Sequence, residues 1–400
     1  MIPQGYKQTE IGMIPQEWSC AKIEDIATIL MCKRIFADQT TENGEIPFYK
    51  IGTFGKEADA YISFALYNEY KNKFSFPKQG DVLISAAGTL GRTVIYDGKD
   101  AYFQDSNIVW LDIDKNVLCN EYLNHYYRVI KWASSEGSTI ARLYNGIIYA
   151  TNIALPPLEE QKHIAETLSD VDSLIFSLEK LIAKKKAVKQ GAMQELLTGK
   201  KRLPGFTGEW KSILLEDVCV FYNGGTPSKK RSDWWNGCIP WISSSDLCEN
   251  SITSVSINRY ITQDALDHSA TRLCPKNAVS IVSRVGVGKV AVTPCELCTS
   301  QDFTTIVSSA HNPYFLAYML VPIMKDMAMQ AQGTSIKGVT VEDIAKIKIS
   351  TPSIKEQNQI VSILSDMDNE IEALEQKLAK TRQIKQGMMQ QLLTGKIRLV

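Results

Sequence analysis

The stretch KQGAMQELLTGKKRL, which begins at Lys189, returns as KQGMMQQLLTGKIRL from Lys385, 196 positions later. Only three of these fifteen positions differ, namely Ala192/Met388, Glu195/Gln391 and Lys201/Ile397. A repeat this strict and this far apart indicates a chain made of two similar halves. Each half can therefore be compared with the other position by position.

The repeat continues upstream without a gap, because PPLEEQKHIAETLSDVDSLIFSLEKLIAKKK from Pro156 aligns with PSIKEQNQIVSILSDMDNEIEALEQKLAKTR from Pro352. Apolar residues recur there at alternating intervals of four and three with charged residues between them, which is typical of a coiled-coil seam. The predicted interface consists of Ile164, Leu168, Val171, Ile175, Leu178 and Ile182 in the first copy, and of Ile360, Leu364, Met367, Ile371, Leu374 and Leu378 in the second.

We expect each copy to form one long helix, the first from about Leu158 to Thr198. Gly199 and Gly395 stand where a C-terminal glycine cap belongs. Gly191 and Gly387 lie inside the helices, where each costs about 1 kcal/mol relative to alanine. Their repetition suggests either close packing or a kink at this point.

Connectivity predicts an antiparallel arrangement. The first helix must run from domain one to domain two, and the second helix starts from domain two. If the two seams bury each other, the domains lie at opposite ends of a two-helix rod and are related by a pseudo-twofold axis. The final GKIRLV stands where GKKRLPGF leads into domain two, so the organisation is nearly circular.

Each half also contains a variable globular domain. Short runs rich in β-branched residues, GDVLIS (80–85), TVIY (93–96) and NIVWLDI (107–113), predict strands. NEYLNHYYRVIKWA and NPYFLAYMLVPIMKDMAMQ predict one helix per domain. The fold class is therefore α+β, with strand-rich domains at 1–155 and 202–351 and helical segments at 156–201 and 352–400.

Composition limits the functional classes. Lys+Arg and Asp+Glu are both 44, so the chain lacks the overall basic charge of many nucleic-acid binders, although a local patch can remain. No run of residues is apolar enough for a membrane span, and MIPQGYKQTE lacks a signal-peptide core. Nine cysteines without framework spacing indicate reduced thiols and a cytoplasmic location.

Catalytic and metal-binding motifs are incomplete. NPYF at Asn312 has one proline where an amino-methyltransferase loop has two, and GVGK at Gly286 lacks both the leading glycine and the following Ser/Thr of a P-loop. The pair Cys295/Cys298 has no second pair at ligand spacing, and the four histidines do not cluster. The sequence therefore predicts no catalytic residue, no metal and no cofactor of its own.

The chain resembles the specificity (S) subunits of type I restriction–modification enzymes. The resemblance is carried by GGTPSKKRSDWWNGCIPWISSSDL from Gly224, GDVLISAAGTLGR from Gly80, LPPLEEQKHIAETLSDVD and QELLTGKKRL, which follow the family's order over nearly the whole length. The first domain departs from the family pattern, since KRIFADQTTENGEIPFYKIGTF replaces its tryptophan-rich form.

The resemblance implies a non-catalytic, sequence-specific subunit that reads a bipartite target in double-stranded DNA, one half-site per target-recognition domain. It further implies two methyltransferase (M) subunits that bind S-adenosylmethionine and methylate adenine, and restriction (R) subunits that can join the complex. The alternative is a coiled-coil tethering protein with two ligand-binding heads. Zero net charge favours this alternative slightly, and the recognition-domain motifs oppose it.

Candidate DNA contacts are polar or basic loop residues in a frame that both halves share. They are Arg34, Lys50, Arg92, Lys229, Lys230, Arg231, Ser243, Arg284 and Lys289. Arg92 and Lys289 keep their charge in both copies, which suits contact with phosphate, a contact that carries no sequence information. Lys229, Lys230 and Arg231 suit either phosphate or a guanine edge. A solvated surface charge remains the simplest alternative for each.

Overall fold

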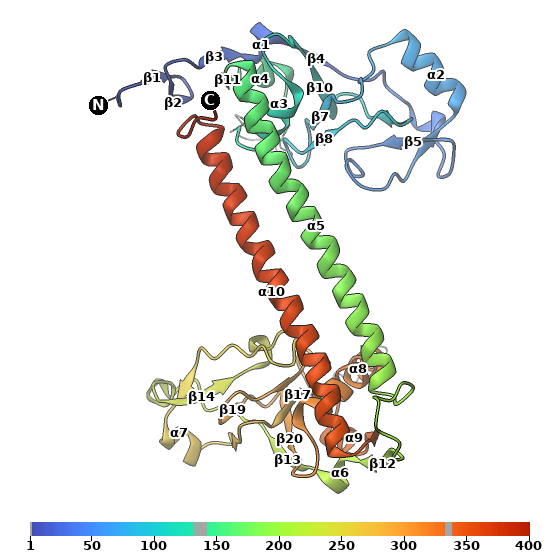
Figure 1. Cartoon of the computed structure of the whole chain (residues 1–400), viewed down its shortest axis with the longest axis vertical. Helices are drawn as coiled ribbons and strands as arrows, with labels where there is room; N and C mark the ends of the chain where they lie inside the picture. Colours follow the sequence, from blue (N-terminus) through green and yellow to red (C-terminus); the bar gives the residue numbers. More distant parts are fainter. Residues whose placement is uncertain (1, 131, 133–141, 333–337) are drawn as a thin grey trace. The chain divides into compact units, whose positions relative to one another are not determined.

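The computed structural model describes residues 2–130, 132, 142–332 and 338–400 (Figure 1). The chain divides into two compact units. Unit 1 comprises Met1–Glu179 and Lys377–Val400, and unit 2 comprises Lys180–Gln376. Each unit therefore contains one globular domain, part of one long helix and part of the other.

Unit 1 is built on a four-stranded antiparallel sheet. Its strand order is β4 (Ala27–Leu30), β10 (Ile108–Ile113), β7 (Val82–Ser85) and β8 (Thr93–Ile95). A second sheet contains β6 (Tyr61–Ile62), β5 (Ile46–Tyr49) and β9 (Tyr102–Phe103), and the pairs β1 (Tyr6–Thr9)/β2 (Gly12–Pro15) and β3 (Ser19–Lys22)/β11 (Asn152–Leu155) complete the unit. The three strands predicted from β-branched runs are confirmed.

The helices of unit 1 differ from the prediction. They are α1 (Ile23–Ile26), α2 (Phe64–Lys73), α3 (Asn120–Tyr126) and α4 (Asn145–Tyr149), with the 3-10 turn η1 (Ala37–Gln39). The expectation of a single helix per domain is wrong here, because α3 ends at Tyr126 and α2 was not predicted. Helix α2 lacks an apolar stripe that the sequence could reveal, although Ser63 caps it by accepting from the Leu66 amide at 3.3 Å. The end of the predicted segment lies outside the described residues.

Unit 2 repeats the same sheet order. Its four-stranded sheet is β13 (Val220–Asn223), β20 (Phe303–Val307), β17 (Val279–Val282) and β18 (Val290–Val292). The second sheet is β15 (Tyr260–Ile261), β14 (Ile239–Ile242), β19 (Leu297–Thr299) and β16 (Leu273–Cys274), and β12 (Lys211–Leu214) pairs with β21 (Lys348–Thr351). The parallel pair β5–β9 recurs as β14–β19. The α+β class and the two similar halves are thereby confirmed.

Unit 2 has one long domain helix, as predicted. This is α8 (Pro313–Gln332), which accompanies the short helices α6 (Leu215–Val218), α7 (Gln263–Asp267) and α9 (Val341–Ala345) and the turns η2 (Ser232–Trp235) and η3 (Ser244–Asp246). The fully buried Phe315 and Leu320 of α8 pack with the strands β17 and β18 in the core of the unit. No helix among the described residues has both the length and the hydropathy of a membrane span.

The long helices are α5 (Leu158–Leu196) and α10 (Ile354–Leu392), with 39 residues each. Gly199 and Gly395 adopt the left-handed conformation, with φ of 67° and 71°, which fits their role as caps. All twelve predicted seam residues are buried or half-buried. Among the residues that the structure describes, none lies within 4 Å of a Cβ built on Gly191 or Gly387, so the close packing suggested there is not found among them.

Ion pairs show that the helix segments run antiparallel within each unit. In unit 1, Asp172 of α5 pairs with Lys385 of α10, and Glu179 pairs with Arg382 at 2.6 Å. In unit 2 the same positions exchange helices: Lys189 pairs with Asp368, and Lys186 with Glu375 at 2.6 Å. The sequence repeat is therefore also a repeat of contacts.

A buried carboxylate joins the C-terminal segment to the start of α5. The side chain of Glu160 is 2% exposed and accepts from Arg398 Nε at 2.6 Å and from Trp18 Nε1 at 2.9 Å. These contacts raise the pKa of Arg398. In unit 2 the equally buried Glu356 accepts from Arg202 Nε at 2.7 Å and Nη2 at 2.8 Å. Arg398 thus takes in unit 1 the place that Arg202 takes in unit 2.

The neighbouring glutamine is also buried in both copies. Gln161 accepts from the Cys119 amide at 3.0 Å and donates to the Pro156 carbonyl at 2.9 Å. Gln357 accepts from the Asn312 amide and donates to the Pro352 carbonyl, both at 3.0 Å. The Glu-Gln pair therefore ties the start of each long helix to its domain.

Replacement of Arg398 by alanine should lower the free energy of unfolding of unit 1 by roughly 3 kcal/mol, because it leaves the Glu160 carboxylate buried without a cation. Urea unfolding of the full chain measures this loss. Arg382→Ala is the matched control, since Arg382 and its partner Glu179 are about half exposed and the pair contributes at most about 1 kcal/mol. Equal losses in the two variants would contradict the structural role of Glu160.

The pH dependence of unit 1 should depend on His125. Burial lowers the pKa of His125 to about 4, Arg128 and Lys385 act in the same direction, and Asp172 opposes them. Between pH 6.5 and 4 the unfolded chain therefore binds a proton that the folded unit does not. As the pH is lowered through this window, the free energy of unfolding should decrease by at most about 3 kcal/mol.

Unfolding measured at pH 4.5 and pH 7 tests this. His125→Ala, which copies Ala317 at the equivalent position of α8, should flatten the profile between these values. His163→Ala, at an exposed position of α5, should leave it unchanged. The pKa of Asp172 is lowered although burial opposes this, because Lys385 and Arg128 stabilise the carboxylate. The contribution of Asp172 to the free energy of unfolding is therefore lost only at pH values below the ordinary pKa of an aspartate, outside the window from pH 4.5 to 7.

Candidate nucleic-acid interface

The predicted contacts of unit 1 gather around the turn at Gln104–Asp105, between β9 and β10. The Gln104 amide donates to the Tyr49 carbonyl at 2.9 Å, and its side-chain oxygen accepts from the Ile51 amide at 2.9 Å. Arg34 Nε donates to Asp105 Oδ2 at 2.8 Å. The turn therefore holds the loop after β5, which carries Lys50, beside the loop after β4, which carries Arg34.

Arg92 completes this group. Its Nη1 donates to the Phe54 carbonyl at 2.8 Å, which fixes the loop after β5 to the β7–β8 turn. Lys50 pairs with Asp59 at 2.9 Å and stays about half exposed. The structure thus brings Arg34, Lys50 and Arg92 to one region of unit 1.

Unit 2 has a related arrangement around its Gln301–Asp302 turn, although no described cation pairs with Asp302 as Arg34 pairs with Asp105. The Ser300 amide donates to the Ile242 carbonyl at 2.8 Å, and the Ser283 amide donates to the Asp302 carbonyl at 2.7 Å. A groove of about 900 Å³ lies here, and Arg284, Gln301 and Asp302 are among its lining residues. Arg284 is exposed at the edge of this groove.

Lys289 has the structural role of Arg92. Its Nζ donates to the Leu247 carbonyl at 3.0 Å and to the Ser244 carbonyl at 3.2 Å. Leu247 is the counterpart of Phe54, so each cation holds the same loop to the same turn. The bonds to these carbonyls give a structural reason for a cation at this position in both copies. Contact of Arg92 or Lys289 with phosphate, through the N–H groups that these bonds do not use, stays a prediction.

Ser243 acts in this structure as a cap of η3. Its amide donates to Asp246 Oδ2 at 2.7 Å, and its hydroxyl accepts from Arg259 Nη2 at 2.7 Å. Arg259 also pairs with Asp246 and lies 4.8 Å from the ring centre of Trp241. Sequence analysis missed Arg259, because its counterpart in the first half carries no matching charge.

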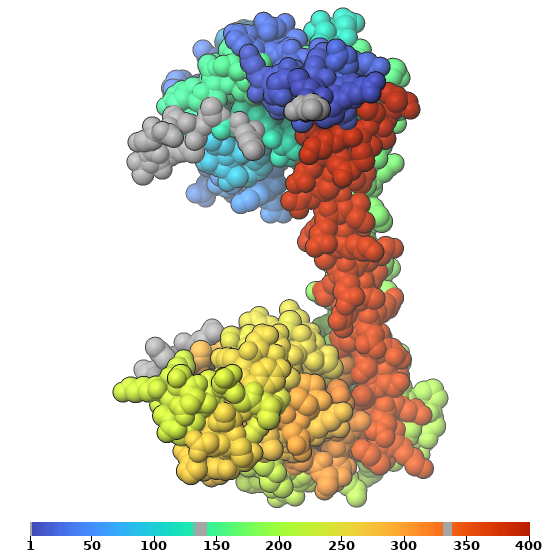
Figure 2. Space-filling model, turned by 90° about the vertical axis from the view of Figure 1, so that its left-hand side faces the viewer, coloured from blue at the N-terminus to red at the C-terminus, as the bar shows by residue number. Residues whose placement is uncertain are grey.

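The basic run after β13 separates into two kinds of residue. Arg231 donates to both carboxylate oxygens of Asp233, at 2.9 Å from Nε and 2.6 Å from Nη2, and lies 4.7 Å from the ring centre of Trp234. Lys229 and Lys230 are exposed and form no ion pair with any described residue. Yellow-green residues of unit 2, in the part of the scale that includes this loop, project from its surface in Figure 2.

The glycines of the GGTP motif have a packing role. A Cβ on Gly224 would lie 1.9 Å from the Ser300 carbonyl oxygen, and one on Gly225 would lie 2.4 Å from the Ala270 carbonyl carbon. Any side chain at either position would separate the loop from the strands behind it. The motif therefore fixes the base of the loop whose tip carries Lys229 and Lys230.

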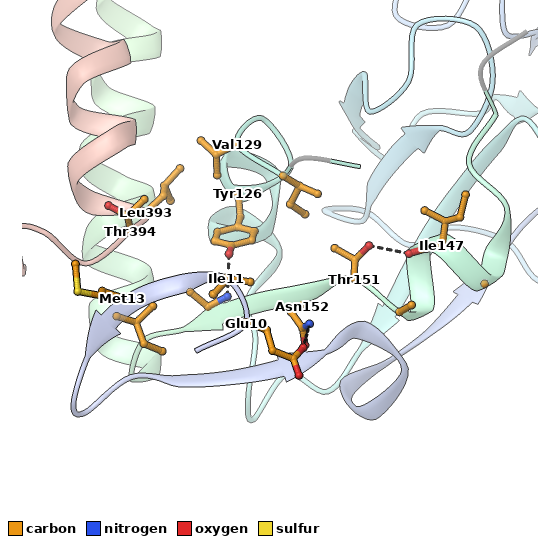
Figure 3. A pocket seen from close by; sticks show the side chains of 15 residues that line it. Glu10, Ile11, Met13, Tyr126, Val129, Ile147, Thr151, Asn152, Leu393 and Thr394 are labelled. Atoms are coloured by element: carbon orange, nitrogen blue, oxygen red, sulfur yellow. Dashed lines mark hydrogen bonds between the residues drawn. The ribbon is translucent and has the colours of Figure 1, made fainter. Parts of the chain in front are cut away.

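One pocket of unit 1 shows no arrangement for chemistry (Figure 3). It measures about 800 Å³ and lies between β2, α4, β11 and the end of α10. Its polar groups are engaged: Tyr126 Oη accepts from the Ala154 amide at 2.9 Å, and Thr151 Oγ1 donates to the Ile147 carbonyl at 2.7 Å. Burial raises the pKa of Tyr126 to about 12, which keeps this phenol neutral.

Metal binding finds no support in the part of the chain that the structure describes. No three His, Cys, Asp or Glu side chains among these residues are placed to hold an ion. Cys298 is fully buried, and burial raises its pKa to about 11, so the thiol remains protonated. Exposed basic and polar loops on two similar frames are suited to binding.

Comparison with known proteins identifies relatives over the whole chain. A family model described as "Type I restriction modification DNA specificity domain" matches residues 15–190 and again 207–383. A putative type I restriction enzyme specificity subunit of Haemophilus influenzae is 54% identical over 157 residues, which are 39% of this chain and 41% of that one. The putative MjaX specificity subunit of Methanocaldococcus jannaschii is 25% identical over 422 residues, 99% of this chain and 97% of that one.

Solved structures share the fold. The type I restriction–modification S subunit from M. genitalium superposes with a TM-score of 0.63 at 14% identity, covering 94% of this chain and 96% of that one. A chain from a study of assembly and conformational transition in a type I system gives 0.58 at 16% identity, covering 96% and 99%. At these identities the likeness concerns the fold alone.

Proposed function

Because this chain belongs to the type I restriction–modification DNA specificity family, we propose that its two units read the two halves of one asymmetric DNA target through the residues around their Gln-Asp turns. The observation that carries this is the combination of an equivalent frame with different exposed side chains. Both units have the same sheet order and the same cation holding the same loop. The exposed loop residues differ, since unit 1 carries Arg34 and Phe36 after β4 where unit 2 carries Lys229 and Lys230 after β13.

Phosphate contacts supply the remaining affinity in this proposal. The net charge is zero, so attraction to DNA depends on local groups such as Lys229 and Lys230. The chain is the recognition subunit, and methyl transfer and cleavage belong to partner subunits. S-adenosylmethionine is accordingly expected on the methyltransferase partner. The family membership does not favour the alternative of a coiled-coil tethering protein.

Exposed residues that recur on both long helices favour the binding of two copies of one partner, the methyltransferase subunit. Gln190, Gly191 and Gln194 on α5 are identical to Gln386, Gly387 and Gln390 on α10, and none of these six residues is buried. Each glycine destabilises its helix by about 1 kcal/mol relative to alanine, and no described residue lies near enough to require it. The requirement is explained if a methyltransferase subunit approaches the backbone closely at each site. Restriction subunits can join such a complex.

The function is tested with the full chain, its methyltransferase partner and a duplex that carries the target found by mapping methylated adenines. We expect sequence-specific binding and adenine methylation by the complex, and neither methylation nor cleavage by the chain alone. Lys229→Ala/Lys230→Ala should weaken binding by about tenfold at 0.1 M salt and lower the slope of log K against log [salt] by about one to two.

Lys346→Ala/Lys348→Ala is the matched control, because it removes the same charge from two exposed lysines of unit 2 at and beside β21. This variant should bind like the wild type. Methyl transfer by the isolated chain would refute the proposed function. Equal weakening in both double variants would place Lys229 and Lys230 outside the reading surface.

The partner sites are tested by Gly191→Leu and Gly387→Leu. Each substitution should stabilise the free chain, because leucine favours a helix by nearly 1 kcal/mol over glycine and the space beside each glycine is open. Each should also block one partner site. Native mass spectrometry should show two methyltransferase subunits on the wild type, one on either single variant and none on the double variant.

Ser177→Leu provides the control for this experiment. Ser177 is exposed on α5, and its counterpart is Ala373, so the position is not retained between the copies. This variant should keep two partner subunits. Two subunits on the double glycine variant would place the partner elsewhere on the chain.

A further inference from the structure

Unit 1 exposes an aromatic ring at the loop that follows β4. Phe36 is 58% exposed, and among the described residues no other ring or cation packs on it. A single exposed hydrophobic residue is ordinary on a protein surface. This one stands two positions from Arg34, whose guanidinium belongs to the group around the Gln104–Asp105 turn.

The loop is fixed on both sides of these two residues. The Lys33 carbonyl accepts from Tyr102 Oη at 3.0 Å, and the Phe36 amide donates to Gln39 Oε1 at 2.9 Å. The Phe36 backbone is extended, with φ −90° and ψ 160°. Arg34 and Phe36 are both exposed on this fixed loop, and two positions along a chain span at most about 7 Å between Cα atoms, so the guanidinium and the ring belong to one small area of the surface.

Asp105 orients the Arg34 side chain. It accepts from Arg34 Nε at 2.8 Å and from the Ser106 hydroxyl at 3.0 Å, and it is largely buried, whereas Arg34 is 59% exposed. Because Nε is engaged, both Nη groups of the guanidinium remain available as donors. A guanidinium held in this way can donate two parallel hydrogen bonds to a planar acceptor pair.

The corresponding loop of unit 2 has a different chemistry. Its tip carries Lys229 and Lys230 and no exposed aromatic residue, and its own arginine, Arg231, donates to Asp233 through both Nε and Nη2. Two equivalent loops on one frame therefore present a guanidinium with a ring in unit 1 and two ammonium groups in unit 2.

We propose that Arg34 and Phe36 determine the half-site of unit 1, Arg34 by donating to O6 and N7 of a guanine and Phe36 by packing on the 5-methyl group of a thymine. The proposal rests on the proposed function. In the major groove the guanine edge offers two acceptors and the thymine edge a methyl group, which match these side chains. Residues two apart are separated by at most about 7 Å between Cα atoms, so the two bases should lie within about two steps of 3.4 Å.

The test of Phe36 replaces each thymine of the target duplex in turn by uracil, which lacks only the 5-methyl group. Binding is measured with the full chain assembled with its methyltransferase partner. For the wild type, one replacement in one half-site should weaken binding about fourfold, the contribution of one buried methyl group. Phe36→Ala should abolish that sensitivity and leave the response of the other half-site unchanged.

Phe64→Ala is the matched control, since Phe64 is an exposed phenylalanine of unit 1 on α2. It should keep the uracil response of the wild type. If no thymine of that half-site responds to uracil in the wild type, and Phe36→Ala nevertheless weakens binding, the proposal is overturned and the ring instead wedges between base steps. A normal uracil response in Phe36→Ala would also overturn it.

The test of Arg34 replaces each guanine in turn by 7-deazaguanine, which lacks the N7 acceptor. One position within two base pairs of the sensitive thymine should weaken wild-type binding about tenfold. Arg34→Lys, which keeps the charge and loses the fork, should no longer distinguish the two bases. Binding that resists both base analogues would refute the roles of Arg34 and Phe36, whereas failure of the wild type to bind its target would refute the proposed function itself.

Discussion

Two buried carboxylates determine how this chain must be assembled. Glu160 and Glu356 stand near the starts of the long helices, and each is neutralised by an arginine that follows the end of the other helix. Removing one partner of such a pair costs several kcal/mol, because the remaining charge is then buried alone. Unit 1 is therefore complete only when residues 377–400 join residues 1–179, and the arginine that both fifteen-residue copies retain meets this requirement in each unit.

Within each unit, the residues that hold the loops in place are different from the residues that the loops expose. Arg92 and Lys289 hold equivalent loops to equivalent turns, and the GGTP glycines of unit 2 let its recognition loop pass close to the strands behind it. A cation is kept at this position in both units, and Gly224 and Gly225 leave no room for a side chain in unit 2. The tips of the loops are free of that constraint and differ fully, as Phe36 and Lys230 illustrate. Two different half-sites can therefore be read from one architecture.

Much of the fold follows from periodicity. Four-three spacing predicts α5 and α10, and runs of β-branched residues predict β7, β8 and β10, since each pattern repeats over enough residues to be recognised. Helix α2 lacks such a pattern and was missed. The roles of Arg92 and Arg259 depend on partners that are distant in sequence, and the buried Glu-Gln pair resembles any helix start. The sequence does not indicate a role for an exposed ring such as Phe36. That role is proposed because the structure places the ring beside Arg34, which Asp105 orients.

Charge balance connects this organisation to discrimination among DNA sequences. A protein with a large positive charge binds any duplex through its phosphates, and that affinity carries no sequence information. Here Arg34, Lys50 and Arg231 each lie beside a carboxylate of their own unit, so part of their attraction to phosphate is already satisfied. The carboxylates also fix the direction in which the remaining donors point. Binding then depends on whether both half-sites present matching base edges, and a target that satisfies only one unit loses the contribution of the other.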